Sequence, residues 1–234
     1  MATTLRAQLL DNHVPRHPAG VVLVLHGGAS RPGRPEVSPA QLSVLRMLPV
    51  AARVARAGRG RLAVLRLLNS SRGWDASHTP VDDVAWAMAR VRERLGELPT
   101  CLVGHSLGGR AALLAAGQPG VRGVVALNPW LYPDDPRQPV DLSGRRVLFV
   151  HGTDDRVAPP ERARAVADRL AHRPDVAEVR YVEVPGGRHA MLRHGATFER
   201  AAARFAVDTL LGEPGSGAGV SAGARSSWRR PPRR

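Results

Sequence analysis

The segment CLVGHSLGGRAALLAAG, residues 101–117, changes its character in the middle. The residues before position 106 are apolar or small, as in a short buried strand, and those after it are rich in alanine and leucine, as in a helix. Ser106 stands at this change, with Gly104 and Gly108 two positions away on either side. The pattern Gly-x-Ser-x-Gly between a strand and a helix predicts a sharp turn that strains the serine and exposes its hydroxyl as a nucleophile.

Strand-like and helix-like segments alternate along the rest of the chain. Short apolar runs predict strands, and longer runs with helical periodicity predict helices. The expected strands are residues 20–28, 61–69, 100–106, 121–130, 145–152 and 177–187, and the expected helices are residues 38–58, 79–96, 106–117, 159–173 and 194–212. This alternation predicts the α/β class, with a mostly parallel twisted sheet that carries helices on both faces.

Residues with known positional preferences mark the helix ends. Ser38 can cap the helix expected over residues 38–58, Pro39 suits its first position, and Gly58 can end it. Pro49 lies inside this segment and is expected to kink or break the helix, because proline has no backbone N–H. Thr79, which a proline follows, is the expected cap of the next helix.

Polar residues follow three of the expected strands, at the edge where parallel sheets carry their sites. Ser106 ends its strand, Asp155 follows the strand 145–152, and His189 follows the strand 177–187. A serine hydroxyl is a poor nucleophile until a base accepts its proton, and His189 is the candidate base. Asp155 is the candidate acid, because such a base needs a carboxylate to fix its tautomer and stabilise the imidazolium.

Attack on a carbonyl group also creates an oxyanion, which needs hydrogen-bond donors already in place. The backbone N–H of Leu107, at the beginning of the expected helix, can supply one donor. The segment LHGGAS, residues 25–30, ends the first strong strand and can supply the second donor from Gly28. Glycine at that position lets the backbone approach a substrate closely.

The motifs LHGG, RGWD, VGHSLGGRAAL, LNPW, HGTDDRVAP and GGRHAML occur in this order. Together they resemble the α/β-hydrolase superfamily, and the pattern is most similar to its small dienelactone-hydrolase-like members. The resemblance spans roughly residues 20–211. It implies that Ser106, Asp155 and His189 are nucleophile, acid and base, that Gly28 and Leu107 are the oxyanion donors, and that ester or related acyl bonds are hydrolysed without a metal or organic cofactor.

The chain departs from that family in three places. The segment before residue 20 is short, so we expect the first strands of the family to be reduced to one, near residues 5–10. The segment between Trp130 and Arg145 is short where many relatives carry a cap, so we expect a loop, no large cap domain and an open site. Dienelactone hydrolases often use a cysteine nucleophile, and here the turn holds a serine, so the resemblance does not name a substrate.

Several residues compete for these roles. Asp154 is the alternative to Asp155, and His194 is the alternative to His189, although His194 is expected inside the last helix. His105 and His151 lie beside the motifs and are expected to bond neighbouring loops. The side chains expected to line a substrate pocket, or else to pack the loops against the sheet edge, are Trp74, Trp130 and Tyr132. No ligand spacing recurs among the nine histidines, so we expect no metal site.

Composition restricts the compartment and the partners. With 234 residues the chain can form one domain with a sizeable core. Its longest apolar run is too short to span a bilayer and its beginning lacks the apolar stretch of a secretory signal, so we expect a cytoplasmic protein without a membrane partner. Cys101 is the one cysteine, which excludes an intrachain disulfide, and its apolar surroundings suit a buried residue.

The net charge of +14 comes entirely from arginine, since the chain has no lysine. The arginines are spread over the expected helices, and they are concentrated only in the last stretch, RSSWRRPPRR. This distribution does not favour a nucleic-acid partner. We expect a hydrolase domain over residues 1–211 and a disordered, basic tail rich in glycine, proline and arginine over residues 212–234.

These observations favour a serine hydrolase, of the carboxylic ester hydrolase kind, that acts on small to medium acyl substrates through an acyl-enzyme. Its partner would be a small-molecule ester. A thioesterase or an acyltransferase would use the same residues and stays open. A non-catalytic binding protein on the same fold is a further alternative, which the presence of all three candidate residues disfavours. The oligomeric state is left open.

Overall fold

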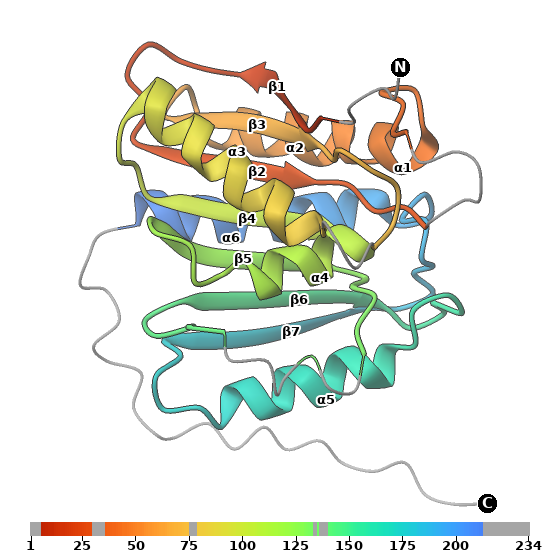
Figure 1. Cartoon of the computed structure of the whole chain (residues 1–234). Helices are drawn as coiled ribbons and strands as arrows, with labels where there is room; N and C mark the ends of the chain where they lie inside the picture. The colour runs from red at the N-terminus through yellow and green to blue at the C-terminus, as the bar shows by residue number, and fades with distance from the viewer. Residues whose placement is uncertain (1–5, 30–35, 75–78, 133–134, 136–139, 213–234) are drawn as a thin grey trace, which may run out of the picture.

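The computed structural model describes residues 6–29, 36–74, 79–132, 135 and 140–212. In chain order, its elements are β1 (Gln8–His13), β2 (Gly20–Leu25), α1 (Leu42–Leu45), α2 (Met47–Ala57), β3 (Leu62–Leu68), α3 (Pro80–Leu95), β4 (Thr100–His105), α4 (Leu107–Leu114), β5 (Val121–Leu127), β6 (Arg146–Gly152), α5 (Pro160–Ala171), β7 (Glu178–Val184) and α6 (Gly195–Leu211). The expected fold class is confirmed: the strands form one seven-stranded sheet with helices on both faces (Figure 1).

The strand order across the sheet is β1-β3-β2-β4-β5-β6-β7. All neighbouring pairs are parallel except β1 and β3, which run antiparallel at the edge. β1 is the expected first strand, although it runs from Gln8 to His13 rather than over residues 5–10, of which residue 5 lies outside the described part. Because β2 to β7 are parallel, their carboxyl ends meet at one edge of the sheet.

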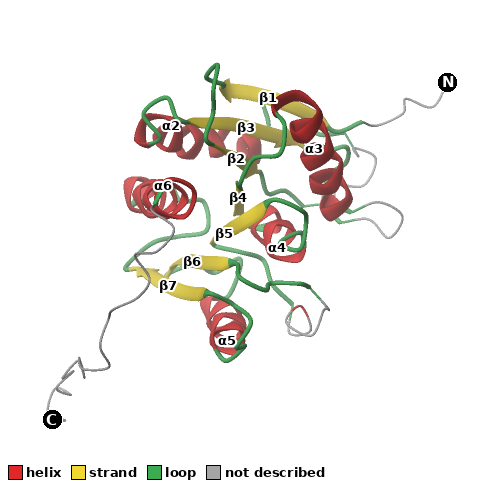
Figure 2. Cartoon of the chain, turned by 90° about the vertical axis from the view of Figure 1, so that its left-hand side faces the viewer, coloured by secondary structure: helices red, strands yellow, loops and turns green. Residues whose placement is uncertain are grey.

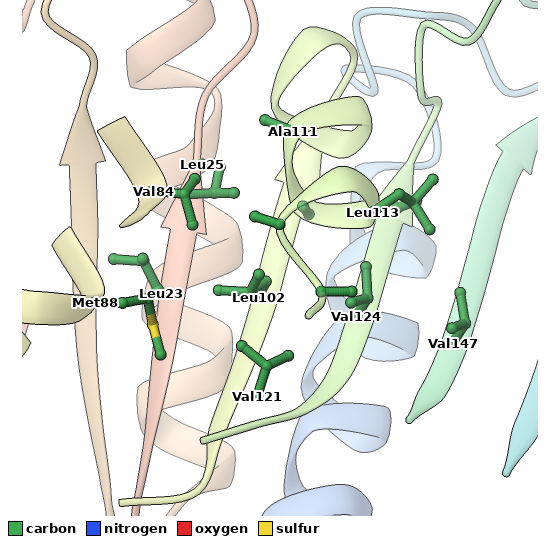
Figure 3. Close-up of a cluster of buried hydrophobic side chains, with 14 of the residues drawn as sticks. Leu23, Leu25, Val84, Met88, Leu102, Ala111, Leu113, Val121, Val124 and Val147 are labelled. Carbon is green, nitrogen blue, oxygen red and sulfur yellow. The ribbon is translucent and has the colours of Figure 1, made fainter. Parts of the chain in front are cut away.

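Two layers of helices cover the sheet, and each layer closes its own core (Figure 2). α2 and α6 bury their apolar residues against one face, where Val54 and Phe198 are fully buried. α3, α4 and α5 cover the other face. Figure 3 shows part of this second core, in which Met88 of α3 lies beside Leu23 of β2, and Leu102 lies on the neighbouring strand β4. Strands apolar on both faces are what a parallel sheet between two layers requires, and they explain the continuous apolar runs in the sequence.

The helix expected over residues 38–58 is broken into α1 and α2, as expected from Pro49, and it ends at Gly58 as predicted. The predicted beginning and the predicted cap, Ser38, were wrong. α1 begins after Gln41, and Ser38 instead accepts a bond from the N–H of Ala40 in the preceding turn. The helix is interrupted at Arg46, and Pro49 is the third residue of α2. The proline ring would clash with the carbonyl of Leu45, four residues earlier, so the break falls between Leu45 and Met47 rather than at the proline.

The beginning of α3 matches its prediction. Thr79 is the N-cap, its Oγ1 accepts from the N–H of Val81 at 3.2 Å, and Asp82 accepts from the N–H of Thr79 at 2.6 Å. Asp83 follows in the first turn but is buried, and it accepts bonds from the N–H and hydroxyl of Ser70 at 2.9 and 3.1 Å. This carboxylate therefore fixes the loop after β3, which leads to Trp74.

The connection between β5 and β6 is short. Of its residues, the structure describes 128–132, 135 and 140–145, and in these it shows no cap domain. The tail predicted over residues 212–234 lies outside the described residues except for Gly212. Among the helices described, none is long and apolar enough to cross a membrane.

Candidate active site

Ser106 adopts a backbone conformation that is rare for any residue with a side chain. Its φ is 55° and its ψ −119°, and it joins β4 to α4 as the N-cap. A Cβ added to Gly104 would lie 2.1 Å from the carbonyl oxygen of Gly108, and one on Gly108 would lie 2.5 Å from that of His26. Both positions therefore exclude every larger residue, and the packing around them holds the serine in its strained turn.

The structure brings the three predicted residues together in one hydrogen-bonded line. The Nε2 atom of His189 lies 3.0 Å from Ser106 Oγ, and its Nδ1 atom lies 2.8 Å from Asp155 Oδ2. Because a carboxylate only accepts hydrogen bonds, Nδ1 carries the imidazole proton and Nε2 is free to accept the proton of the serine. This arrangement can activate the hydroxyl.

The Asp155 carboxylate is buried but well supplied with donors. Its Oδ1 accepts from the N–H groups of Val157 and Ala158 at 2.8 and 2.9 Å, and His151 Nε2 lies 3.4 Å from Oδ2. Burial alone would raise the pKa of Asp155, but the hydrogen bonds from His151, His189 and Ala158 outweigh it and hold that pKa well below its ordinary value. Asp155 therefore stays ionised beside the imidazole.

The structure also separates the alternatives. Asp154 is exposed, and its side chain lies beside Thr153 rather than beside His189. His194 is the N-cap of α6, one residue before the helix begins, so the expectation that it lies inside the helix was wrong. His151 binds the carbonyl of Ala158 at 2.9 Å.

The predicted oxyanion donors face the same pocket as Ser106. Leu107 is the first residue of α4, where the N–H groups have no partner within the helix. Gly28 has a φ of 143°, which only glycine adopts without strain. His26 fixes the segment that precedes Gly28. Its Nδ1 donates to the carbonyl of Gly27 at 2.6 Å, and its Nε2 accepts from the N–H of Asn69 at 3.1 Å. Burial lowers the pKa of His26, in keeping with a neutral ring that does both.

A pocket of about 410 Å³ opens at Ser106. The residues that line it are Gly27, Gly28, Ala29, Ser43, Arg46, Gly73, Trp74, His105, Ser106, Leu107, Trp130, Tyr132, Val157 and His189. All three aromatic side chains expected to form a pocket are among them. In the part of the chain that is described, no group of three or more histidine, cysteine or acidic residues could hold a metal ion.

Comparisons with known proteins agree with this architecture. A family model described as the alpha/beta hydrolase fold matches residues 67–144. An α/β serine hydrolase homologue from Coxiella burnetii superposes with a TM-score of 0.60 at 17% identity, over 85% of this chain and 90% of that one. The chain has the α/β-hydrolase fold.

Two other solved structures extend the likeness. Est1E from Butyrivibrio proteoclasticus, with ferulic acid bound, has a TM-score of 0.63 at 17% identity, over 88% of this chain and 95% of that one. A serine hydrolase without a lid from Xanthomonas campestris has a TM-score of 0.56 at 19% identity, over 86% and 87%. No curated protein matches the sequence.

Within this α/β-hydrolase fold, Asn128 is a residue that sequence reasoning missed. It is fully buried at the end of β5, and its Nδ2 donates to the carbonyls of Arg188 and His189 at 3.1 and 3.2 Å. Its Oδ1 accepts from the N–H of Gly152 at 2.9 Å. Asn128 thus ties the end of β6 to the loop that carries His189. The sequence marks this role only weakly, by an asparagine directly after a buried strand. Asparagine tolerates the observed φ of 42° better than most residues.

Arg110 was also missed. It belongs to α4, directly behind the Ser106 turn, and its guanidinium lies 3.9 Å from the centre of the Trp74 ring and 4.7 Å from that of Tyr132. Asp135 accepts from Arg110 Nε and Nη2 at distances of 2.7 to 3.0 Å, and also from the N–H of Tyr132 at 2.7 Å. One arginine therefore holds two aromatic walls of the pocket in place.

Proposed function

We propose that the protein is a serine hydrolase that cleaves carboxylic esters, or closely related acyl bonds, of small to medium substrates. The observation that carries this proposal is the line of hydrogen bonds from Ser106 through His189 to Asp155 at the mouth of a pocket of about 410 Å³. In the proposed mechanism Ser106 is the nucleophile, His189 the base and Asp155 the acid. A pocket of this volume suits a small to medium organic molecule.

In the acylation step, Ser106 Oγ bonds to the carbonyl carbon of the ester while its proton moves to His189 Nε2. The carbonyl oxygen becomes an oxyanion, to which the N–H groups of Gly28 and Leu107 would donate. The tetrahedral intermediate then collapses: the bond between carbon and the alcohol oxygen breaks, and the alcohol leaves with the proton from His189. Asp155 stabilises the imidazolium in between.

In the second half, a water molecule gives its proton to His189 and attacks the acyl carbon. Collapse of this intermediate breaks the bond to Ser106 Oγ, which recovers the proton, and the carboxylic acid is released. Water must therefore reach the acyl-enzyme. Tyr132 and Val157 at the pocket are 48% and 51% exposed, so the site is open to solvent, which favours hydrolysis over transfer to another acceptor.

Proteins that share the fold support an ester as the substrate. They include the Est1E structure with ferulic acid, an esterase called PE8 and a monoacylglycerol lipase from Paleococcus ferrophilus. The order of the motifs supports a place among the small dienelactone-hydrolase-like members, although the serine at position 106 argues against transferring their substrate. A thioester substrate would need the same residues.

The test is labelling with a fluorophosphonate probe, which reacts only with an activated serine. We expect the wild type to be labelled and Ser106→Ala to remain unlabelled. Ser143→Ala is the matched control, because Ser143 is exposed and lies before β6, away from the pocket. A chain-length series of nitrophenyl esters then measures the size of the acyl group accepted. A folded wild type that is neither labelled nor active on these esters would rule out the proposed function and favour a binding protein.

A further inference from the structure

Among the residues that the structure describes, one permanently charged side chain lines the pocket at Ser106. Among its described lining residues there is no aspartate or glutamate, and Arg46 is the one arginine. His105 also lines the pocket, but burial lowers its pKa to about 3, so this ring is neutral near pH 7. A substrate in the pocket therefore meets a single cationic group that no acidic lining residue neutralises.

The Arg46 side chain forms no hydrogen bond or ion pair with any residue that the structure describes. Its Nε atom is buried without a partner, and burial lowers the pKa of the guanidinium. Arg110, which contacts Trp74 and Tyr132 but does not itself line the pocket, differs in that its charge is matched by the two oxygens of Asp135. An arginine that is partly withdrawn from water and left without an anion is unfavourable, and a ligand anion would relieve that cost.

The neighbours of Arg46 in the described part of the chain do not supply such an anion. Arg46 also lines an adjoining groove of about 430 Å³, whose one acidic lining residue is Glu199. The Oε2 atom of Glu199 instead lies 3.7 Å from the Nε atom of Arg53, which follows Arg46 by seven residues in α2. The guanidinium of Arg46 thus remains available from the side of the pocket.

A second donor stands beside it. Ser43 precedes Arg46 by three residues, so the two side chains share one face of the α1 turn, and both line the pocket. Gln41 Nε2 donates to Ser43 Oγ at 2.5 Å, which leaves the Ser43 proton for another acceptor. A Cβ on Gly28 would lie 3.5 Å from Ser43 Oγ, so this hydroxyl lies next to the proposed oxyanion donor.

We propose that Arg46 and Ser43 form a subsite for an oxyanion group, a carboxylate or a phosphate, which the ester substrate carries close to its scissile bond. This inference rests on the proposed function and narrows it from esters in general to anionic esters. The planar guanidinium suits both groups because it can donate two parallel hydrogen bonds to them. The subsite would also select against neutral esters, since these leave the buried charge without a partner.

The test compares two nitrophenyl esters with acyl chains of equal carbon number, the hydrogen glutarate and the pentanoate. The measured quantity is the ratio of kcat/KM for the anionic ester to that for the neutral one. We expect Arg46→Gln to lower this ratio by about 10-fold to 100-fold, as for loss of a charge-assisted hydrogen bond, and Ser43→Ala to lower it less. Arg56→Gln is the matched control, because Arg56 is exposed in the last turn of α2 and its replacement changes the net charge equally.

A second pair, 4-carboxyphenyl butyrate and phenyl butyrate, places the charge in the alcohol part instead. A ratio that falls in Arg46→Gln for either pair, and not in Arg56→Gln, supports the subsite and identifies the side of the ester that it binds. Ratios that stay at the wild-type value in Arg46→Gln for both pairs overturn it, while turnover of the neutral esters leaves the proposed function standing.

A binding measurement decides the inference without any turnover. Glutarate and inorganic phosphate are titrated separately into the wild type, Arg46→Gln and Arg56→Gln by isothermal titration calorimetry. Binding of either anion that is lost in Arg46→Gln alone supports the subsite, and the anion that binds more tightly identifies carboxylate or phosphate. If neither anion binds the wild type, or if Arg46→Gln binds as tightly as the wild type, the subsite is excluded, whatever the fluorophosphonate probe shows about Ser106.

Discussion

The Nε2 atom of His105 donates a hydrogen bond of 2.8 Å to the backbone carbonyl of His189. The residue that precedes the proposed nucleophile therefore holds the loop that carries the proposed base, and the two rings lie 5.0 Å apart between centroids. Asn128 donates to the same carbonyl at 3.2 Å. Two buried side chains from neighbouring strands thus fix the position of His189 relative to Ser106.

Asn128 is expected to matter both for stability and for the position of His189. Asn128→Gly should lower the free energy of unfolding by about 3 kcal/mol, because three hydrogen bonds worth about 1 kcal/mol each are lost while glycine adopts the φ of 42° freely. Asn128→Ala should cost about 1 kcal/mol more, since alanine is strained there. Urea denaturation measures both values.

The rate of fluorophosphonate labelling separates the two roles of Asn128. A displaced His189 activates the serine less well, so we expect folded Asn128→Gly to be labelled about tenfold more slowly than the wild type. Labelling at the wild-type rate, together with reduced stability, would mean that Asn128 supports the fold and that His105 alone positions the base.

Stability is expected to fall as the pH is lowered from about 6.5. Burial lowers the pKa of His105 to about 3 and also lowers that of His26, so both are neutral in the folded chain, whereas an unfolded histidine takes up a proton near pH 6.5. The unfolded chain therefore binds more protons in this range, and each such histidine removes about 1.4 kcal/mol of stability per pH unit. The contribution is fully present above pH 6.5 and is lost progressively toward the folded pKa.

Urea denaturation at pH 7, 6 and 5 tests this expectation. The lowered pKa of Asp155 acts in the same direction, but only below about pH 4, outside the measured range. His105→Gln should reduce the slope of unfolding free energy against pH, whatever its effect on absolute stability. A slope equal to that of the wild type would show that His105 is not a neutral buried histidine.

Much of the site could be predicted because its signals are local. Ser106 stands in a five-residue Gly-x-Ser-x-Gly pattern, Asp155 follows the continuous apolar run of β6, and His189 follows β7, whose apolar residues are interspersed with charged ones. The parallel sheet then brings the three strand ends to one edge, so their proximity follows from topology. The sequence alone left Asp154 as an alternative to Asp155, and in the structure it is Asp155 whose carboxylate lies within hydrogen-bond distance of the His189 imidazole.

The residues that were missed act through contacts far apart in the sequence. Asn128 binds carbonyls about sixty positions away, and Arg110 binds a carboxylate twenty-five positions away. Both stand inside quoted motifs, Asn128 in LNPW and Arg110 in VGHSLGGRAAL, but neither motif shows which groups their side chains bind. The sequence predicted that Pro49 kinks or breaks its helix but not where. The interruption lies at Arg46, because a proline acts on the preceding turn of the helix.

The pair of Arg110 and Asp135 yields a prediction about the pocket wall. Their side chains are 13% and 5% exposed, so Arg110→Met leaves a buried carboxylate without its partner and should cost about 3 kcal/mol in unfolding free energy. The double variant Arg110→Met with Asp135→Asn should recover part of this loss, because the buried charge is gone. Chemical denaturation of the wild type, both single variants and the double variant measures the coupling.

The same variants report on the substrate. Trp74 and Tyr132 lose the cation between them in Arg110→Met, so we expect a higher KM for nitrophenyl esters with a smaller change in kcat. Arg110→Lys keeps the charge but not the paired hydrogen bonds and should lie between the wild type and Arg110→Met. An unchanged KM in both variants would show that the aromatic walls keep their positions without the arginine.

The packing around the Ser106 turn gives the sharpest expectation. In Gly104→Ala the new methyl carbon would lie 2.1 Å from the carbonyl oxygen of Gly108. The three atoms nearest to it are all backbone atoms of Gly108 and Gly109, so the turn itself must move. We expect this variant to lose about 3 kcal/mol or more of stability and to lose fluorophosphonate labelling even where it folds. Gly117→Ala is the matched control, because a Cβ there meets its nearest neighbour at an ordinary 3.4 Å. Labelling of Gly104→Ala at the rate of Gly117→Ala would show that the close contact of β4 with α4 does not hold the serine in its reactive position.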